Sequence, residues 1–193
     1  MNLCNGDSVV GLPENRTVDY LIQKRKEDIS KLCELRNEYL ADPSNPKLIE
    51  QIIDITTRLR EDLNEEFKNY LDRAGLPVEV IDDTIPFHWA LDFWYFYFNE
   101  KGEPLPEENR GADIVIGNPP YERIQVLVKK APIYVEYLNK CGFKSAFKNY
   151  DLAVIFIERG FSLLREDGEF GYIVTNKFVQ ADYGKATRKY LSD

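Results

Sequence analysis

The stretch that decides the fold lies at residues 113–121 and reads Asp113-Ile114-Val115-Ile116-Gly117-Asn118-Pro119-Pro120-Tyr121. The β-branched run at residues 114–116 predicts a strand covered on both faces, as in a parallel sheet. Gly117 lets the backbone turn or approach a ligand closely. Because ligands of open α/β sheets bind beyond the carboxyl ends of strands, we expect residues 118–121 to lie at a ligand site.

The tetrapeptide at residues 118–121 carries groups that suit a planar amino group. The side-chain oxygen of Asn118 and the backbone carbonyl of Pro119 can each accept a hydrogen bond from a conjugated –NH2. Pro119 and Pro120 fix φ and lack N–H donors, which stiffens the loop. Tyr121 can stack on the ring that bears the amino group. The alternative is an ordinary proline-rich turn in which Asn118 caps the backbone. The position directly after an apolar strand favours the functional interpretation.

Several segments of the chain resemble one family of enzymes. Residues 116–121 resemble the catalytic motif of the S-adenosylmethionine-dependent amino-methyltransferases, which act on adenine N6 in DNA or on glutamine N5 in proteins. Residues 149–158 and 168–178 resemble the next helix and strand of the DNA enzymes, and residues 183–191 resemble the helix beyond. The resemblance is to the gamma-class adenine-N6 DNA methyltransferases of type IIG restriction–modification systems and their relatives in phage defence.

The resemblance implies an α/β fold class, a partial Rossmann-like S-adenosylmethionine-dependent methyltransferase fold with an inserted α-helical hairpin. It also implies double-stranded DNA with a flipped adenine as the partner, S-adenosylmethionine as the cofactor, and no metal for methyl transfer. The site residues that it implies are Asn118, Pro119, Pro120 and Tyr121 for catalysis, Asp7 for the cofactor, and Lys177, Tyr183 and Lys185 for DNA.

Asp7 has two possible roles. It stands in the turn Gly6-Asp7-Ser8, which interrupts a short β-prone stretch at residues 3–10. In the resembled family, a segment of this kind follows the third strand, and its acidic residue contacts the adenine of S-adenosylmethionine. The alternative is a turn aspartate that bonds its own backbone. Both interpretations stay open at this point.

The charge of the chain limits how it can bind DNA. The formal net charge is −8, the wrong sign for a free-standing nucleic-acid binder, whose affinity rests largely on phosphate contacts. DNA affinity must therefore come from elsewhere or from a local patch. Lys177, Lys185, Arg188 and Lys189 are the candidate patch, with a solvated helix face as the alternative.

The composition indicates a cytoplasmic protein. The sequence has no run of 18 apolar residues and no secretory signal. Its three cysteines, Cys4, Cys33 and Cys141, are too scattered for a disulfide framework or a zinc site, and they suggest a reducing compartment.

Two long helices are expected in the first half. The first covers residues 17–40 with Thr17 as its cap. The second starts at Pro46 after the N-cap Asn45, and the Ala74-Gly75-Leu76-Pro77 stretch ends it. Together they predict an antiparallel hairpin that serves as a structural or partner-binding arm. The expected division is residues 1–13 and 81–193 for the methyltransferase core and residues 14–80 for the inserted hairpin.

The second half predicts a crossover unit. Residues 85–98 are densely aromatic, and their His88, the single histidine of the chain, has no metal or catalytic partner in sequence and is expected to pack structurally. Residues 123–130 could be helix or strand, and residues 132–140 read as a helix. A firm helix at 151–165 and a buried strand at 170–174 follow, so that strand, helix and strand form a parallel unit.

The cofactor loop of the resembled family is not found in the sequence. No Gly-x-Gly loop stands at a strand-to-helix junction. We therefore expect the central part of a larger methyltransferase, whose partners are an N-terminal half and a target-recognition part, and we expect the isolated chain to be inactive and to bind the cofactor weakly. The alternatives are a methyltransferase for protein glutamine or an RNA base, and a non-enzymatic remnant whose helical arm binds a partner.

Overall fold

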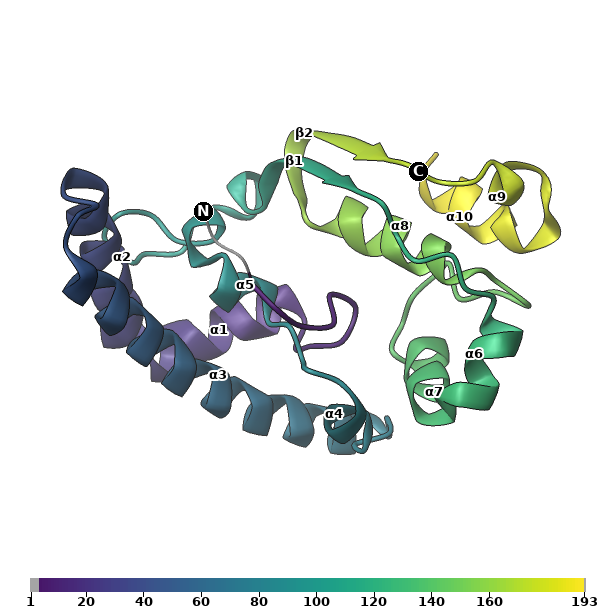
Figure 1. Ribbon diagram of the computed structural model, residues 1–193, viewed down its shortest axis with the longest axis horizontal. Helices are drawn as coiled ribbons and strands as arrows, with labels where there is room; N and C mark the ends of the chain where they lie inside the picture. Colours follow the sequence, from purple (N-terminus) through teal and green to yellow (C-terminus); the bar gives the residue numbers. More distant parts are fainter. Residues whose placement is uncertain (1–3, 193) are drawn as a thin grey trace. The chain divides into compact units, whose positions relative to one another are not determined.

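The computed structural model describes residues 4–192 and divides into two compact units, each described by itself (Figure 1). The helical unit comprises the residues up to 70 together with 85–111. The strand unit comprises residues 71–84 and those from 112 onward. These units group the aromatic stretch with the helices. The expected functional division after residues 13 and 80 stays a prediction, and residues 1–3 and 193 lie outside the described part.

Three helices build most of the helical unit, namely α1 (Glu14–Lys24), α2 (Lys26–Ala41) and α3 (Pro46–Ala74). The expected single helix at 17–40 is wrong, because the backbone breaks at Arg25, with φ −136° and ψ 27°. Thr17 is not the cap either. It lies fully buried inside α1, where its hydroxyl is 3.2 Å from the carbonyls of both Leu12 and Pro13 and donates to one of them at a time.

The hairpin of α2 and α3 is antiparallel, as expected. Ion pairs join Arg25 to Asp62 at 2.7 Å and Arg58 to Asp28 at 3.6 Å, so rising numbers in one helix meet falling numbers in the other. Asn45 caps α3 by accepting from the Lys47 N–H at 3.1 Å. The helix ends in a Schellman motif, in which Gly75 has φ 66° and the Leu76 N–H donates to the Leu71 carbonyl.

Leucine and aromatic side chains fill the core of the helical unit. The apolar stripe of α3 is buried as its spacing predicts. Two short helices, α5 (Trp89–Asp92) and η1 (Trp94–Phe96), add aromatic side chains, and η2 (Glu107–Asn109) follows at the surface. The residues of this unit that are at most 1% exposed and hydrophobic are Val9, Val10, Val18, Leu21, Ile29, Leu32, Leu35, Leu59, Leu63, Phe67, Ala90 and Leu91.

His88 joins three segments of this core. It is fully buried, its Nδ1 accepts the Leu12 N–H at 3.2 Å, and its Nε2 lies 2.9 Å from Asn64 Oδ1. Because Nδ1 accepts, the proton is on Nε2 and donates to Asn64. Burial, and then the charge of Arg60, lower the pKa of His88 to about 4. His88 is therefore a neutral structural residue, as expected.

The strand unit holds a two-stranded parallel sheet of β1 (Ala112–Gly117) and β2 (Leu164–Tyr172). Val115 lies opposite Phe170, and Gly117 lies opposite Tyr172. A bulge shifts the register between Ala112 and Ile114, where Asp167 takes φ 63°. The mixed helices and parallel strands confirm the expected α/β class at this coarse level.

Helices precede, separate and follow the two strands, and Figure 1 shows α8 running beside them. Residues 124–130 are helical, which resolves the open choice there. The helix expected at 151–165 ends earlier, at Ser162. The strand predicted at 170–174 starts six residues earlier, because β2 begins at Leu164. The helices of the unit are α4 (Val80–Asp83), α6 (Ile124–Lys130), α7 (Pro132–Lys140), α8 (Leu152–Ser162), α9 (Lys177–Gln180), η3 (Asp182–Gly184) and α10 (Lys185–Tyr190).

The strands are not buried on both faces, so that expectation is wrong. Ile114 is 61% exposed, Ile116 79% and Ile173 74%. Side chains alternate along a strand, so Ile114 and Ile116 share one face, and α8 packs against the opposite face through Phe170 and Tyr172. No described residue of the strand unit covers the sheet face that carries Ile114 and Ile116.

None of the helices within residues 4–192 combines the length and the apolar character that crossing a membrane requires.

Candidate functional site

The tetrapeptide at residues 118–121 leaves the carboxyl end of β1, as the sequence predicts. Pro119 is buried and anchors the loop, whereas Asn118, Pro120 and Tyr121 are exposed. The Ile173 N–H donates to the Gly117 carbonyl at 3.0 Å, which ties the start of the loop to the chain that leaves β2. The loop therefore presents the side chains of Asn118 and Tyr121 to solvent from a fixed base.

Gly117 makes room for a ring at the base of this loop. A Cβ on Gly117 would lie 3.0 Å from Tyr172 Cε1, and one on Gly160 of α8 would lie 2.5 Å from the Tyr172 hydroxyl. Tyr172 thus sits against two glycines, and burial raises the pKa of its hydroxyl. A side chain at residue 117 would push the ring or the loop away.

The Tyr121 hydroxyl has two acceptors within reach. Asn118 Oδ1 lies 2.8 Å away, and the Ile173 carbonyl also accepts from this hydroxyl. A hydroxyl carries one proton, so it serves one acceptor at a time. When the proton points to Ile173, Asn118 Oδ1 can accept a hydrogen bond from another amino group. Tyr121 as a whole is 48% exposed, which leaves its side chain accessible to a planar partner.

Three short segments meet beside the loop and enclose a cavity of about 220 Å³. Two predicted DNA-contacting residues, Lys177 and Tyr183, line it together. Lys185 is exposed at the start of α10 and is not part of the lining. The lining residues are Arg123, Gln125, Asn149, Asp151, Lys177 and Tyr183.

Sequence reasoning missed Arg123, Gln125 and Asn149 as site residues. Arg123 stands two residues after Tyr121, and the position of this charge was the available signal. The cavity itself arises from segments about 25 residues apart, which no local pattern joins. Asp151 has a local role as well, because its carboxylate caps α8 by accepting the Ala153 N–H at 3.1 Å.

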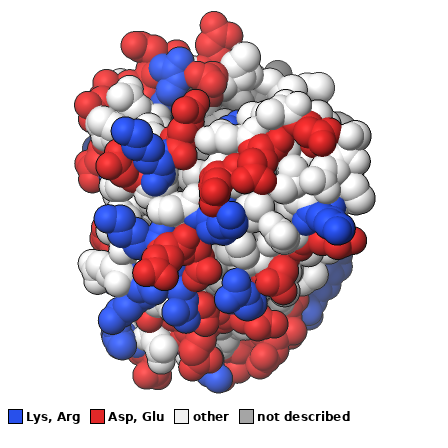
Figure 2. All heavy atoms as spheres, turned by 90° about the vertical axis from the view of Figure 1, so that its left-hand side faces the viewer, with Lys and Arg blue, Asp and Glu red and all other residues white. Residues whose placement is uncertain are grey.

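The rest of the predicted basic patch is divided. The Arg188 guanidinium donates to the carbonyls of Phe178, at 2.6 Å, and Ala181, at 3.0 Å. Arg188 therefore holds α9 in place, while Lys185 and Lys189 face solvent. On the face that carries α2 and α3, Figure 2 shows acidic and basic side chains interspersed, in keeping with the overall negative charge.

Asp7 belongs to the helical unit and sits in a turn. Its Oδ1 accepts the Val9 N–H at 3.1 Å, and its backbone N–H donates to the Ile85 carbonyl at 2.7 Å. The turn-forming alternative is thus present in the structure. The cofactor contact of Asp7 stays a prediction. Across residues 4–192, no group of three or more His, Cys, Asp or Glu side chains is placed to hold a metal ion.

Comparison with known proteins identifies the family. The sequence profile described as "Eco57I restriction-modification methylase" matches residues 21–193. The chain belongs to the Eco57I restriction-modification methylase family. The family match covers both units and includes the loop at residues 118–121.

Individual relatives carry names of the same kind. The chain is 37% identical over 133 residues to the Type II restriction enzyme and methyltransferase RM.Eco57I of Escherichia coli, which covers 62% of this chain and 13% of that protein. It is 33% identical over 81 residues to the Type II methyltransferase M.BstVI of Geobacillus stearothermophilus, covering 42% of this chain and 14% of that protein. No solved structure matches. The chain thus spans less than one sixth of these relatives' length.

Proposed function

We propose that this chain carries the amino-group acceptor site of an adenine-N6 DNA methyltransferase in a restriction–modification system. The observation that carries the proposal is the loop at residues 118–121, which leaves a parallel strand and exposes Asn118 and Tyr121 beside each other. The names of the relatives support DNA methylation as the activity. We also propose that the whole enzyme has a Rossmann-like fold, and that β1 and β2 are two strands of its sheet.

Each residue of the loop has a task in this proposal. Asn118 Oδ1 and the Pro119 carbonyl accept the two N–H groups of the flipped adenine, which favours a tetrahedral nitrogen with an available lone pair. Pro120 keeps the loop stiff, and the exposed ring of Tyr121 stacks on the base. The chain acts by positioning and polarising the amino group, without a general base.

The methyl donor we propose is S-adenosylmethionine, which supplies an electrophilic methyl group. Bound S-adenosylmethionine would supply its methyl group to the N6 nitrogen that Asn118 and Pro119 hold, and the nitrogen would release its extra proton to solvent. Among the described residues, we assign one cofactor contact, between the Asp7 side chain and the adenine of S-adenosylmethionine. One half-buried carboxylate does not make a complete donor set, so most of the cofactor site is proposed to lie outside these residues.

A further part of the enzyme is proposed to cover the open face of the sheet. Ile114, Ile116 and Ile173 are more than 60% exposed, and a two-stranded sheet is marginally stable by itself. We therefore expect the 193-residue chain alone to be inactive. Calorimetry with S-adenosylmethionine should show no micromolar binding to it, and a micromolar dissociation constant would contradict that expectation.

The proposed function is tested with the full-length product of the gene. It is incubated with methyl-labelled S-adenosylmethionine and with duplex DNA, RNA or a glutamine-containing protein substrate. We expect label in DNA and a loss of labelling in Asn118→Ala. Label in protein or RNA would establish the alternative substrate classes, and equal labelling by Asn118→Ala would remove the loop from catalysis.

A further inference from the structure

The cavity beside the catalytic loop combines two positive charges with neutral hydrogen-bonding groups. Arg123 and Lys177 supply the cations, and among residues 4–192 neither side chain makes an ion pair. The side chains of Gln125, Asn149 and Tyr183 add amide and hydroxyl donors. The single carboxylate, Asp151, is turned to the start of α8, where it accepts the Ala153 N–H. The lining therefore has a surplus of positive charge and donors.

Two of the three parts of the lining, at residues 123–125 and 149–151, are held in place by contacts of their backbone. Residues 123 and 151 form an antiparallel bridge, and the Leu152 N–H donates to the Glu122 carbonyl at 2.8 Å. Buried Glu158 accepts the N–H groups of Lys144 and Ser145, at 2.9 and 2.7 Å, and so fixes the loop that leads to Asn149. The cavity is thus part of the fold and does not depend on long side chains alone.

Both cations are connected closely to the catalytic loop. Arg123 follows Tyr121 by two residues, which separates their Cα atoms by at most about 7 Å. Lys177 follows Ile173 by four residues, and the Ile173 carbonyl accepts from the Tyr121 hydroxyl. A group bound in the cavity therefore lies on the chain segments that position Tyr121 and Asn118.

The geometry points to a subsite for a backbone phosphate of the DNA strand whose adenine is methylated, held by Arg123 and Lys177 with Tyr183 and Asn149 as neutral donors. This inference rests on the proposed function and deepens it. It adds Arg123, Asn149 and Gln125 to the contacts with DNA, and it gives Lys177 and Tyr183 a shared ligand.

Size and charge favour a phosphate over other groups. The cavity of about 220 Å³ is smaller than the roughly 300–1,000 Å³ of pockets that enclose drug-sized ligands. Lys and Arg side chains are the usual phosphate contacts, and such contacts fix the register of a protein on DNA. The chain has a net charge of −8, so a cavity with two unpaired cations is a local site of positive charge on a negatively charged molecule.

The test compares the full-length product with Arg123→Gln, Lys177→Gln and the double variant. DNA affinity is measured by fluorescence anisotropy from low to moderate salt. Each single variant should weaken binding about tenfold at low salt and reduce the slope of log K against log[salt] by about 1, and the double variant by about 2. Circular dichroism checks that each variant is folded, and Arg123→Lys should keep the slope because it keeps the charge.

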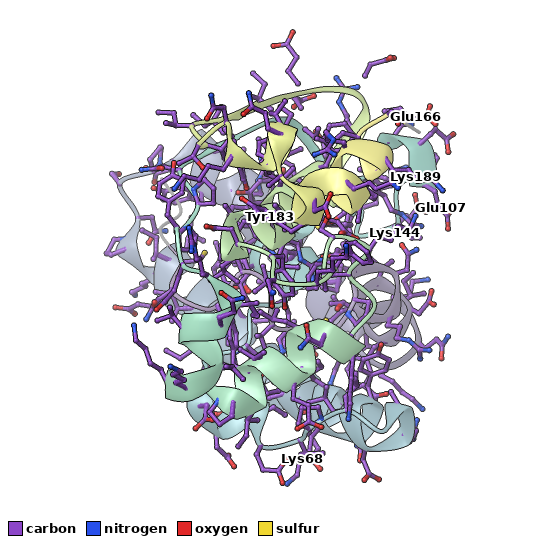
Figure 3. The ribbon with its side chains drawn as sticks, turned by 90° about the vertical axis from the view of Figure 1, so that its right-hand side faces the viewer. Lys68, Glu107, Lys144, Glu166, Tyr183 and Lys189 are labelled. Atoms are coloured by element: carbon purple, nitrogen blue, oxygen red, sulfur yellow. The ribbon has the colours of Figure 1, made fainter. Side chains whose placement is uncertain are left out.

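The matched control is Lys129→Gln, which removes one exposed cation from α6 of the same unit outside the cavity. Its slope should remain that of the wild type. Equal effects of Lys129→Gln and Lys177→Gln, or unchanged slopes in the cavity variants, would overturn the inference. Tyr183, labelled in Figure 3, lies in η3 just before α10. Because tyrosine carries no charge, Tyr183→Phe should lower the DNA affinity less than the cation variants do and leave the salt slope unchanged.

Two further experiments distinguish a free-phosphate site from a DNA phosphate site and separate the subsite from the proposed function. Inorganic phosphate at matched ionic strength should not displace DNA, and displacement at millimolar concentration would identify a free-phosphate site and overturn the inference. Asn118→Ala should bind DNA with the wild-type slope but not methylate it. If Asn118→Ala methylates normally while the cavity variants lose slope, the proposed function fails and the phosphate subsite stands.

Discussion

In α3, Leu59, Leu63 and Phe67 are at most 1% exposed, whereas in β1 Ile114 and Ile116 are 61% and 79% exposed. Both segments carry strongly apolar residues at the spacing of their element. The helical unit buries its stripes against its own helices and aromatic residues. The strand unit covers one face of its sheet with α8 and leaves the other face open within residues 4–192. The helical unit thus buries its apolar stripes within the described residues, whereas the sheet that carries the loop at residues 118–121 leaves one apolar face exposed, which we propose a further part of the enzyme covers.

The largest effect is expected from truncating the core of the helical unit. Leu63→Ala removes a fully buried side chain and should lower the free energy of unfolding by about 4 kcal/mol, since the transfer and cavity terms add. Urea unfolding followed by far-UV circular dichroism measures it. A loss below about 1 kcal/mol would show that the arm is not independently packed and would break the comparison.

A pH effect of about 3 kcal/mol is expected from His88 in the same unit. Its pKa of about 4 in the folded chain lies below the usual 6.5. Between those values the unfolded chain binds a proton that the folded chain excludes, so stability should fall as the pH is lowered from 6.5 to 4.

His88→Gln isolates this contribution, because glutamine offers both an acceptor and a donor without titrating. The difference between wild type and variant in the free energy of unfolding, measured at pH 7 and pH 4, removes the opposing effect of Asp92, whose pKa burial raises despite its ion pair with Arg60. Parallel pH curves for the two proteins would contradict the assignment.

A smaller effect is expected where the strand unit is closely packed. Gly117→Ala places a Cβ 3.0 Å from the Tyr172 ring and should cost about 1–2 kcal/mol through overpacking. Gly171→Ala is the matched control, since its Cβ would meet its nearest neighbour, Ile116, at an ordinary 3.6 Å. Thermal unfolding of both variants decides, and an equal loss in both would show that the α8 face is no tighter than the open face.

The smallest effect is expected on the open face of the sheet. Ile116→Ala should change the stability of the 193-residue chain by less than about 0.5 kcal/mol, because little of this side chain is removed from water. In the full-length product the same substitution should cost about 2 kcal/mol or more if a further layer covers this face. Equal small effects in both proteins would refute that proposal.

Local signals in the sequence predicted local structure well. Asn45 and Pro46 set the start of α3 and Gly75 sets its end, because capping and positive φ depend on the residue itself. The break at Arg25 was not predicted. Neither proline nor glycine stands there, and the apolar spacing continues across it.

Features that depend on distant contacts were less predictable. Burial of Ile114 and Ile116 is set by what packs on the sheet, and a β-branched run cannot say whether that layer lies within the chain. The tetrapeptide at residues 118–121 was placed correctly at a strand end because its motif is contiguous. The cavity of Arg123, Asn149 and Lys177 joins three separated segments and needed the structure.

The most direct measurement is the amount of N6-methyladenine that the full-length product forms in DNA, determined by mass spectrometry of digested nucleosides. We expect methylation by the wild type and by Asn69→Ala, an exposed asparagine of α3, and a reduction of more than about 100-fold in Asn118→Ala. Wild-type levels of N6-methyladenine from Asn118→Ala would contradict the central claim that the loop after β1 holds the adenine amino group.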